Sequence, residues 1–160
     1  MMLRASYGTI QKVNGRLSLE MDTAYLMLGE RCVYNCLYCA QSRSSTSPSH
    51  FLSRVIWKEI PEDLLDELND RFKRICIQVV SYPSYGKDLS LIIPRFRIPV
   101  SVSVRAVSIE EVVEYFELGA DRVGIAVDVP NKDLFEKIRG GKYERHLHIL
   151  EKSAEMFTGK

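Results

Sequence analysis

The feature that most constrains the fold of this sequence is an alternation of short strand-like segments, three of which are rich in β-branched residues, with amphipathic segments of helical period. The strand-like segments are 24–28, 74–80, 99–105 and 122–128. Helical periodicity predicts helices at 64–72, at 109–118 after a capping box of Ser108 and Glu111, at 131–139 and at 143–157. Strands that alternate with helices of this length are typical of βαβ units. We therefore predict an α/β fold with a parallel sheet and right-handed crossovers.

The N-terminal residues 1–23 carry turn signals instead of a long periodic pattern. Gly8 and Asn14-Gly15 favour a short hairpin or a cover on the sheet. A chain of 160 residues has the size of one domain, so we expect a single core over residues 1–160. The strand at 122–128 is the last strand predicted and should form a parallel edge of the sheet.

The charge balance of the chain excludes some classes of partner. The 22 Lys and Arg residues nearly balance the 21 Asp and Glu residues, which gives a net charge of +1. Such a balance provides no long-range field for nucleic acid or an anionic membrane surface, so neither is an expected partner. The apolar runs are far shorter than the ~20 residues that span a bilayer, and the N-terminus lacks the apolar segment of a secretory signal. We expect a cytoplasmic protein whose function depends on a local site.

Three of the four cysteines follow immediately after the first predicted strand. Their spacing is C-x3-C-x2-C, with thiols at Cys32, Cys36 and Cys39. In parallel α/β folds ligands bind at the carboxyl ends of the strands, so three thiolates there can converge on one centre. Sulfur ligands favour zinc or iron–sulfur centres, and a zinc site that uses His50 is one alternative. His146 and His148 lie two apart on the last helix and are expected at the surface.

The cysteine spacing, with Tyr38 as the aromatic residue before the third cysteine, resembles the C-x3-C-x-aromatic-C motif of the radical S-adenosylmethionine (SAM) superfamily. The resemblance implies a (β/α)6-type barrel, of which this chain would form a partial (β/α) barrel of about four parallel βα units. It also implies a [4Fe-4S] cluster on Cys32, Cys36 and Cys39, with SAM on the iron that no cysteine binds. Reductive cleavage of SAM would then give a 5′-deoxyadenosyl radical, which abstracts a hydrogen atom from an unactivated carbon.

The same resemblance assigns cofactor-binding residues on the later strands. Asp128 is similar to the aspartate that holds the SAM ribose in biotin synthase, although the family's preceding Asn is Ala126 here. Gln78 is assigned to the SAM amine, with Ser81 as the alternative, because the family's Gly-Gly-Glu segment for that amine is absent here. Arg105 is a candidate for the SAM carboxylate. A helix cap for Asp128 and a surface ion pair for Arg105 are the structural alternatives. With Tyr38, these residues form the expected cofactor site, and no catalytic residue is assigned.

The residues after the third cysteine point to one branch of the superfamily. The segment Cys39-Ala40-Gln41-Ser42-Arg43 is similar to the C-x-Q-S segment of biotin synthase and lipoyl synthase, which insert sulfur at C–H bonds. Cys76 stands where biotin synthase has one ligand of an auxiliary cluster, but residues 101–103, where it has a second, contain no cysteine. We therefore expect Cys76 to be a small core residue. Sulfur insertion into an aliphatic C–H bond is the first expectation, and methylthiolation or a carbon-skeleton change is the alternative.

Four predicted βα units are two fewer than the barrel of that superfamily has. The chain is therefore expected to be a fragment of a longer protein, to close its barrel with a second subunit, or to keep an open site. The expected partners are a small or carrier-bound aliphatic substrate and an electron donor of ferredoxin or flavodoxin type. A non-catalytic subunit that only binds a metal or an iron–sulfur cluster is the alternative from another class of function.

Overall fold

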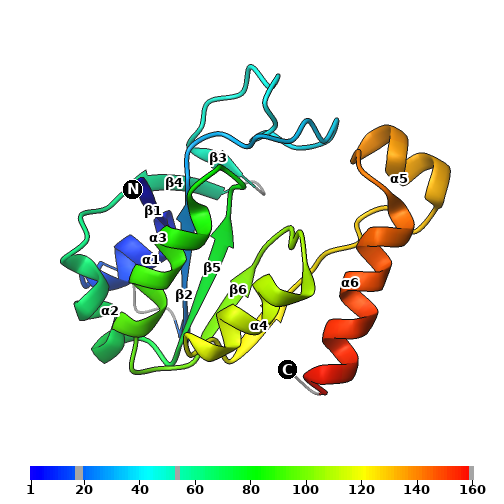
Figure 1. The fold of residues 1–160 in the computed structure, drawn as a ribbon. Helices are drawn as coiled ribbons and strands as arrows, with labels where there is room; N and C mark the ends of the chain where they lie inside the picture. Colours follow the sequence, from blue (N-terminus) through cyan, green and yellow to red (C-terminus); the bar gives the residue numbers. More distant parts are fainter. Residues whose placement is uncertain (17–19, 53–54, 159–160) are drawn as a thin grey trace.

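A computed structural model of the chain describes residues 1–16, 20–52 and 55–158 (Figure 1). Its strands form one mixed sheet of seven strands. In their order across the sheet, the strands are β3 (Phe51–Leu52), β4 (Val55–Glu59), β1 (Leu3–Ser6), β2 (Thr23–Leu28), β5 (Arg74–Val79), β6 (Val100–Ser103) and β7 (Arg122–Gly124).

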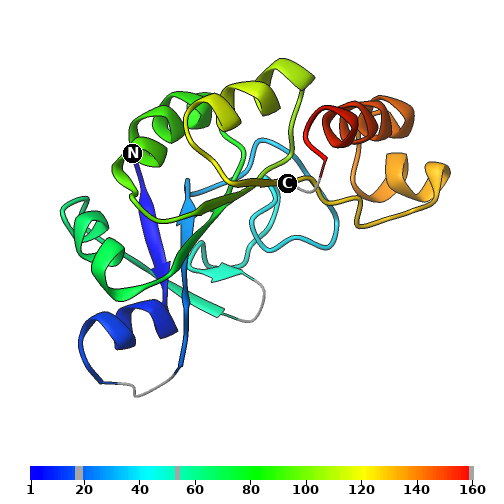
Figure 2. The same cartoon turned by 90° about the horizontal axis from the view of Figure 1, so that it is seen from below.

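The four strands that the sequence predicts form the parallel half of this sheet. β2, β5, β6 and β7 run parallel, with Leu26 opposite Ile77 and Ile77 opposite Val102. These apolar residues belong to the core under α2 (Leu64–Arg71), α3 (Tyr85–Ile92) and α4 (Ile109–Glu117), which cover one face of the sheet (Figures 1 and 2). The predicted partial barrel of about four parallel βα units is thus confirmed.

The opposite face of the parallel strands carries more polar side chains. Tyr25, Cys76 and Ser101 lie side by side there, because Cys76 is opposite both of the others in the register. The Arg74 guanidinium donates to the Ser101 hydroxyl at 2.9 Å and pairs with Asp121 at 2.8 Å. Cys76 is half-buried on this face, and burial raises its pKa. It lies outside the core in which we expected it, because that core packs on the helix side of the sheet.

Residues 1–23, for which we predicted a short hairpin or a cover on the sheet, contribute a strand and a helix. β1 is an inner strand that pairs antiparallel with both β2 and β4. The helix α1 (Tyr7–Val13) follows directly, because the Ser6 hydroxyl caps it by accepting a hydrogen bond from the Thr9 amide at 3.2 Å. The turn signal at Asn14-Gly15 ends this helix, with φ +65° at the glycine. The part of the prediction that falls on residues 17–19 lies outside the described residues.

Several short elements have no counterpart in the sequence patterns. β1, β3 and β4 span two to five residues, which is too short for an alternation of apolar and polar residues to be recognised. α3 contains Gly86 and lies between Pro83 and the 3-10 helix at Ile93–Arg95, so its segment resembles a loop in composition. Packing of Leu89 and Ile92 into the core compensates for the weak local preference.

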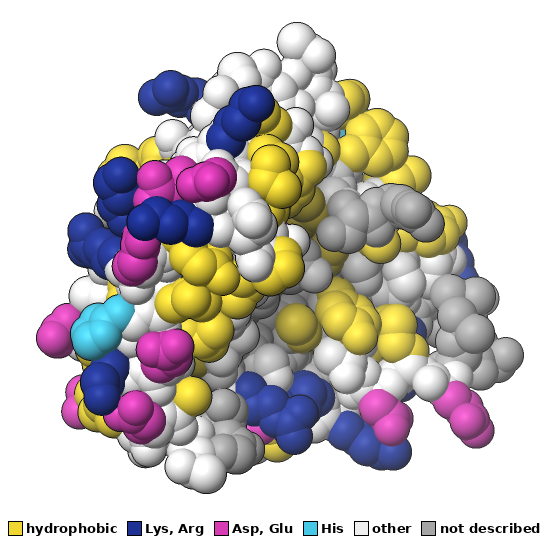
Figure 3. Space-filling view, turned by 90° about the vertical axis from the view of Figure 1, so that its right-hand side faces the viewer, with side chains coloured by type: hydrophobic (Ala, Val, Ile, Leu, Met, Phe, Trp, Pro, Cys, Tyr) yellow, Lys and Arg dark blue, Asp and Glu magenta, His cyan; other side chains and the backbone are white. Residues whose placement is uncertain are grey.

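β7 is shorter than the strand predicted over 122–128. β6 ends at Ser103, so the residues beyond Gly124 have no neighbouring strand with which to pair. They lead to α5 (Lys132–Ile138) and α6 (Tyr143–Met156), which match the two predicted helices. Within the described residues β7 pairs with β6 alone and forms the expected edge. Figure 3 shows the molecule from the side of α5 and α6, where apolar side chains gather around a hollow.

Over the described ranges, no helix is long and apolar enough to cross a lipid bilayer.

Candidate functional site

The three clustered cysteines lie on the loop of residues 29–50, which leads from the carboxyl end of β2 to β3. Gly29 begins this loop at φ +96°, a backbone conformation that residues with a side chain rarely adopt. A Cβ atom there would lie 2.6 Å from ring carbons of Tyr82 and 2.8 Å from the Val80 carbonyl oxygen. Glycine therefore lets the loop pass close to the end of β5.

Two buried side chains hold the cysteine loop in place. Arg4, on β1, donates to the carbonyl oxygens of Gly29 and Ser49. Gln41 donates from its side-chain nitrogen to the Ser49 carbonyl oxygen at 2.8 Å and to the Phe51 carbonyl oxygen at 2.7 Å. Arg4 and Gln41 are 1 % and 2 % exposed, so these bonds are shielded from competing water. The loop is thereby fixed to a strand that precedes it in the sequence.

All three thiols line one cavity of about 240 Å³. The same cavity is lined by every cofactor-binding residue that the resemblance assigns, namely Tyr38, Gln78, Arg105 and Asp128. Gln78 is on β5, whereas Arg105 and Asp128 follow the ends of β6 and β7. The carboxyl ends of the parallel strands thus bring the seven predicted residues together, as expected of this class of fold. His50, the alternative zinc ligand, is not among the residues that line this cavity.

Each of the three sulfurs has a hydrogen-bond donor nearby. The backbone amides of Tyr34 and Gln41 lie 3.4 Å from the sulfurs of Cys32 and Cys39, respectively. The Arg105 guanidinium lies 3.7 Å from the Cys36 sulfur. Such donors stabilise thiolates, the form that binds metal. Burial raises the pKa of Cys39, the Gln41 amide opposes part of this rise, and the charges of Cys36 and Cys32 add to it.

The donor set of the cavity fits a cubane cluster with a further polar ligand. In the described parts of the chain, no three Cys, His, Asp or Glu side chains are close enough to share a single metal ion. The three ligands of a cubane cluster do not have to meet at one ion, because each thiolate binds a different iron. Gln41 Oε1 and Arg139 Nε, on two residues that line the cavity, are buried and have no hydrogen-bond partner within the described residues. An unpaired acceptor and an unpaired donor are therefore available to a bound molecule.

Asp128 connects the cysteine loop to the chain that follows β7. Its Oδ2 atom accepts a hydrogen bond from the Tyr38 hydroxyl at 2.8 Å and an ion-paired bond from the buried Arg139 guanidinium. Asp128 has φ +58°, which directs the chain away from the strand. The helix-cap alternative for this carboxylate is wrong, because the Asn131 side chain caps α5 by accepting from the Leu134 amide at 3.0 Å.

Arg105 lies between the cysteine loop and the turn that joins α5 to α6. Its guanidinium stacks 3.9 Å from the centre of the Tyr34 ring and donates to the carbonyl oxygens of Arg139 at 3.1 Å and Gly140 at 2.5 Å. It forms no ion pair with any carboxylate that the structure describes, so the surface ion pair considered for Arg105 is not found. Its positive charge is next to Cys36 instead.

Sequence reasoning missed three residues of this region. Arg4 and Arg139 are buried arginines whose partners are far away in sequence, so neither belongs to a local motif. His146 was expected at the surface but is only 6 % exposed, and its Nε2 lies 2.9 Å from the Ala126 carbonyl oxygen. Desolvation by burial lowers the pKa of His146. His148 is exposed, as predicted.

A family model described as the Radical SAM superfamily matches residues 26–159. The crystal structure of HydG, a maturase of the FeFe-hydrogenase, is similar with a TM-score of 0.65 and 16 % identity, over 83 % of this chain and 32 % of that chain. HydG from Carboxydothermus hydrogenoformans is similar with a TM-score of 0.64 and 19 % identity, over 83 % and 33 %. Methylornithine synthase (PylB) is similar with a TM-score of 0.61 and 12 % identity, over 83 % and 41 %.

The chain therefore spans less than half the length of these three solved structures, whose low sequence identities support a shared fold alone. No curated protein matches the chain in sequence.

Proposed function

Because the chain belongs to the radical SAM superfamily, we propose that Cys32, Cys36 and Cys39 bind a [4Fe-4S] cluster on which SAM is cleaved reductively. The observation that carries this proposal is the single cavity lined by the three thiols and by the residues assigned to SAM. The cluster and SAM are the cofactors of this superfamily. Held by Cys32, Cys36 and Cys39, a reduced [4Fe-4S] cluster would supply the one electron that breaks the S–C5′ bond of SAM, which would give methionine and a 5′-deoxyadenosyl radical.

The residues of the chain have separate tasks in this proposal. The amides of Tyr34 and Gln41 and the guanidinium of Arg105 stabilise the charge on the thiolates. Both interactions of Asp128 use Oδ2, so Oδ1 remains to accept a hydrogen bond from a ribose hydroxyl. Gln78 is half-buried on the cavity wall and carries an amide oxygen that suits the amine of SAM.

For the reaction itself, we propose sulfur insertion into an aliphatic C–H bond. Support comes from the segment Cys39-Ala40-Gln41-Ser42-Arg43, in which Gln41 is buried and bonded to both Ser49 and Phe51. Cys76 is the one cysteine left over, so a second cluster built as in biotin synthase would need ligands from elsewhere. Methylthiolation and a carbon-skeleton change are the competing reactions, and the products identify which one occurs.

The partners in this proposal follow from the chemistry. One electron per SAM has to come from a donor of ferredoxin or flavodoxin type, and the substrate is a small or carrier-bound aliphatic molecule. A second polypeptide or a further part of the same protein would complete the barrel beyond β7. The cytoplasmic location and the absence of nucleic-acid and membrane partners stay predictions.

Anaerobic reconstitution with iron and sulfide, followed by chromatography of the products of SAM under dithionite, tests the proposal. We expect four irons per chain, the electron paramagnetic resonance (EPR) signal of a reduced [4Fe-4S] cluster, and 5′-deoxyadenosine. A brown protein that forms no 5′-deoxyadenosine would refute the enzyme and favour a non-catalytic cluster-binding subunit. A colourless protein that retains one zinc per chain would refute the cluster as well.

A further inference from the structure

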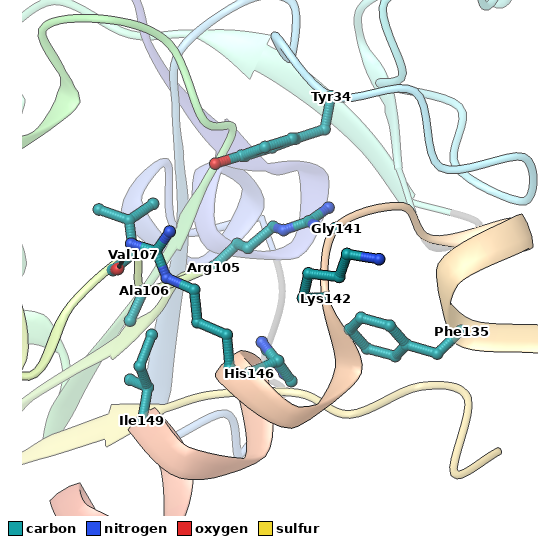
Figure 4. A pocket seen from close by; sticks show the side chains of 10 residues that line it. Tyr34, Arg105, Ala106, Val107, Phe135, Gly141, Lys142, His146 and Ile149 are labelled. Atoms are coloured by element: carbon teal, nitrogen blue, oxygen red, sulfur yellow. Dashed lines mark hydrogen bonds between the residues drawn. The ribbon is translucent and has the colours of Figure 1, made fainter. Parts of the chain in front are cut away.

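A second cavity, of about 300 Å³, adjoins the cysteine cavity, and Figure 4 shows the side chains that line it. Arg105 and Tyr34 line both cavities, and the second cavity otherwise lies between the end of β6 and the start of α6. Its lining residues are Tyr34, Arg105, Ala106, Val107, Phe135, Gly141, Lys142, Arg145, His146 and Ile149. The proposed function uses Arg105, which lines both cavities, but gives no role to the rest of this cavity.

The charges around this cavity are of one sign. Arg105, Lys142 and Arg145 are cationic, and no Asp or Glu among the described residues lines the cavity. Arg105 is half-buried and, over the described residues, has backbone carbonyls and the Cys36 sulfur as its partners but no carboxylate. The Lys142 ammonium is 3.2 Å from a Glu136 carboxylate oxygen, so that charge is largely compensated. A partly desolvated guanidinium without a carboxylate favours an anionic ligand.

Apolar side chains line a large part of the cavity. Phe135 and Ile149 are buried, and Ala106 and Val107 complete this part of the lining. Figure 4 shows the Tyr34 ring above Arg105, with Phe135 and Ile149 on opposite sides of the space below. A ligand that fills this space therefore has an apolar body as well as a charged group.

We propose that this cavity binds a short aliphatic carboxylate, with its carboxylate on Arg105 and Arg145 and its chain against Phe135 and Ile149. A carboxylate matches the planar fork of a guanidinium, which can donate two parallel N–H bonds to it. Arg145 is exposed and donates to the Val107 carbonyl oxygen at 2.9 Å, so its guanidinium is at the rim of the cavity. The proposal rests on the described side chains and does not require that the chain cleaves SAM.

Calorimetric titration of the full chain with hexanoate tests this site, without SAM and without reductant. We expect one hexanoate per chain, and binding at least tenfold weaker for hexanamide, which has the same shape but no charge. Inorganic phosphate, an anion without an apolar body, should also bind at least tenfold more weakly than hexanoate. Equal binding of hexanoate and hexanamide, tighter binding of phosphate, or no binding of hexanoate would overturn the proposal.

Variants locate the site within the chain. Arg105→Gln should weaken hexanoate binding about tenfold or more, and Arg145→Gln, at the rim, about threefold. Arg97→Gln is the matched control, because Arg97 is an exposed arginine paired with Asp70 on another part of the surface. The affinity of this variant for hexanoate should equal that of the natural chain. Circular dichroism identifies an Arg105→Gln chain that fails to fold, in which case Arg145→Gln decides.

The two proposals fail separately. A chain that binds hexanoate through Arg145 but forms no 5′-deoxyadenosine refutes the proposed function alone. Conversely, a chain that cleaves SAM but binds hexanoate equally well after Arg105→Gln and Arg145→Gln refutes the carboxylate site alone.

Discussion

The Tyr38 hydroxyl donates a hydrogen bond of 2.8 Å to the Asp128 carboxylate, so the residue before the last clustered cysteine is fixed to the segment that follows β7. The same carboxylate oxygen pairs with Arg139, whose side chain is 5 % exposed. This small network encloses one side of the cysteine cavity, and its strength is measurable in the absence of any cofactor.

Removing the Tyr38 hydroxyl should weaken the network slightly, and removing the charge of Asp128 should weaken it more. We expect Tyr38→Phe to lower the free energy of unfolding by about 0.5–1 kcal/mol, since Tyr38 is half exposed. Asp128→Asn leaves the Arg139 charge uncompensated and should cost about 1–3 kcal/mol. Urea denaturation of the cluster-free chain measures both. In Tyr25→Phe, which removes a hydroxyl without a hydrogen-bond partner within the described residues, stability should not change.

The cysteines are expected to differ sharply in their importance for the cluster. Cys36→Ala removes one of three thiolates and should abolish both the bound iron and the formation of 5′-deoxyadenosine. Cys76→Ala should leave the iron content and SAM cleavage intact, because Cys76 is not among the residues that line the cysteine cavity. Iron and sulfide analysis with EPR measures the outcome, and loss of the primary cluster in Cys76→Ala would contradict this assignment.

Arg4 lies on β1, outside the cysteine loop, but should keep that loop ordered. Arg4→Met removes the donors to the carbonyl oxygens of Gly29 and Ser49 and should cost about 2–3 kcal/mol, because buried acceptors lose their partners. Hydrogen–deuterium exchange should rise first in residues 29–50. The matched control is Arg71→Met, whose arginine is exposed at the end of α2. If exchange of the loop rises equally in both variants, Arg4 has no special role in holding it.

Gly29 should tolerate no side chain. Gly29→Ala combines a positive φ with contacts of 2.6 Å to Tyr82 and 2.8 Å to Val80, so we expect a loss of about 2 kcal/mol or more. Gly86 provides the control, because a Cβ there meets nothing within 4 Å and the residue is in the helix α3. Gly86→Ala should raise the stability by about 0.5–1 kcal/mol. Thermal denaturation of the two variants distinguishes these opposite effects.

His146 should make the stability of the chain depend on pH. Burial, together with the charges of Arg139 and Arg105, lowers the pKa of His146 below its ordinary value near 6.5. The unfolded chain therefore binds the proton more readily than the folded chain does. The contribution of the neutral imidazole is complete above pH 6.5 and is lost as the pH falls below that value. Urea denaturation between pH 5 and 8 should show this loss in the natural chain and a flatter profile in His146→Gln.

The sequence predicts those parts of the molecule whose signal is local. The cysteine spacing is contained in eight residues, and three of the four parallel strands have β-branched runs of their own, so the fold class and the cysteine cluster could be predicted from local signals. The resemblance to the family assigned the other four residues that line the cysteine cavity, and their roles stay predictions. β1 has four residues, one of them a buried arginine, and nothing local marks it as an inner strand.

Residues whose partners are far away in the sequence cannot be identified from local patterns. The ion pair of Arg139 with Asp128 depends on the turn after α5, and the role of Arg4 depends on a loop that begins 25 residues later. In the sequence, His146 looks like a surface residue, because its neighbours Arg145 and Leu147 do not indicate which face of the helix is buried. Only the docking of α6 near Ala126 buries its ring.

The hydrogen bond between the Leu37 amide and the Ile138 carbonyl oxygen, together with the contact of the Cys36 sulfur to the Arg139 carbonyl oxygen across 103 positions, implies an order of folding. Contacts between such distant positions carry a large loop-closure entropy and form late. During synthesis, the cysteine loop therefore leaves the ribosome long before the segment that anchors its tip. The loop reaches its final shape only when α5 has emerged and docked, so we expect iron to be loaded only after α5 is in place.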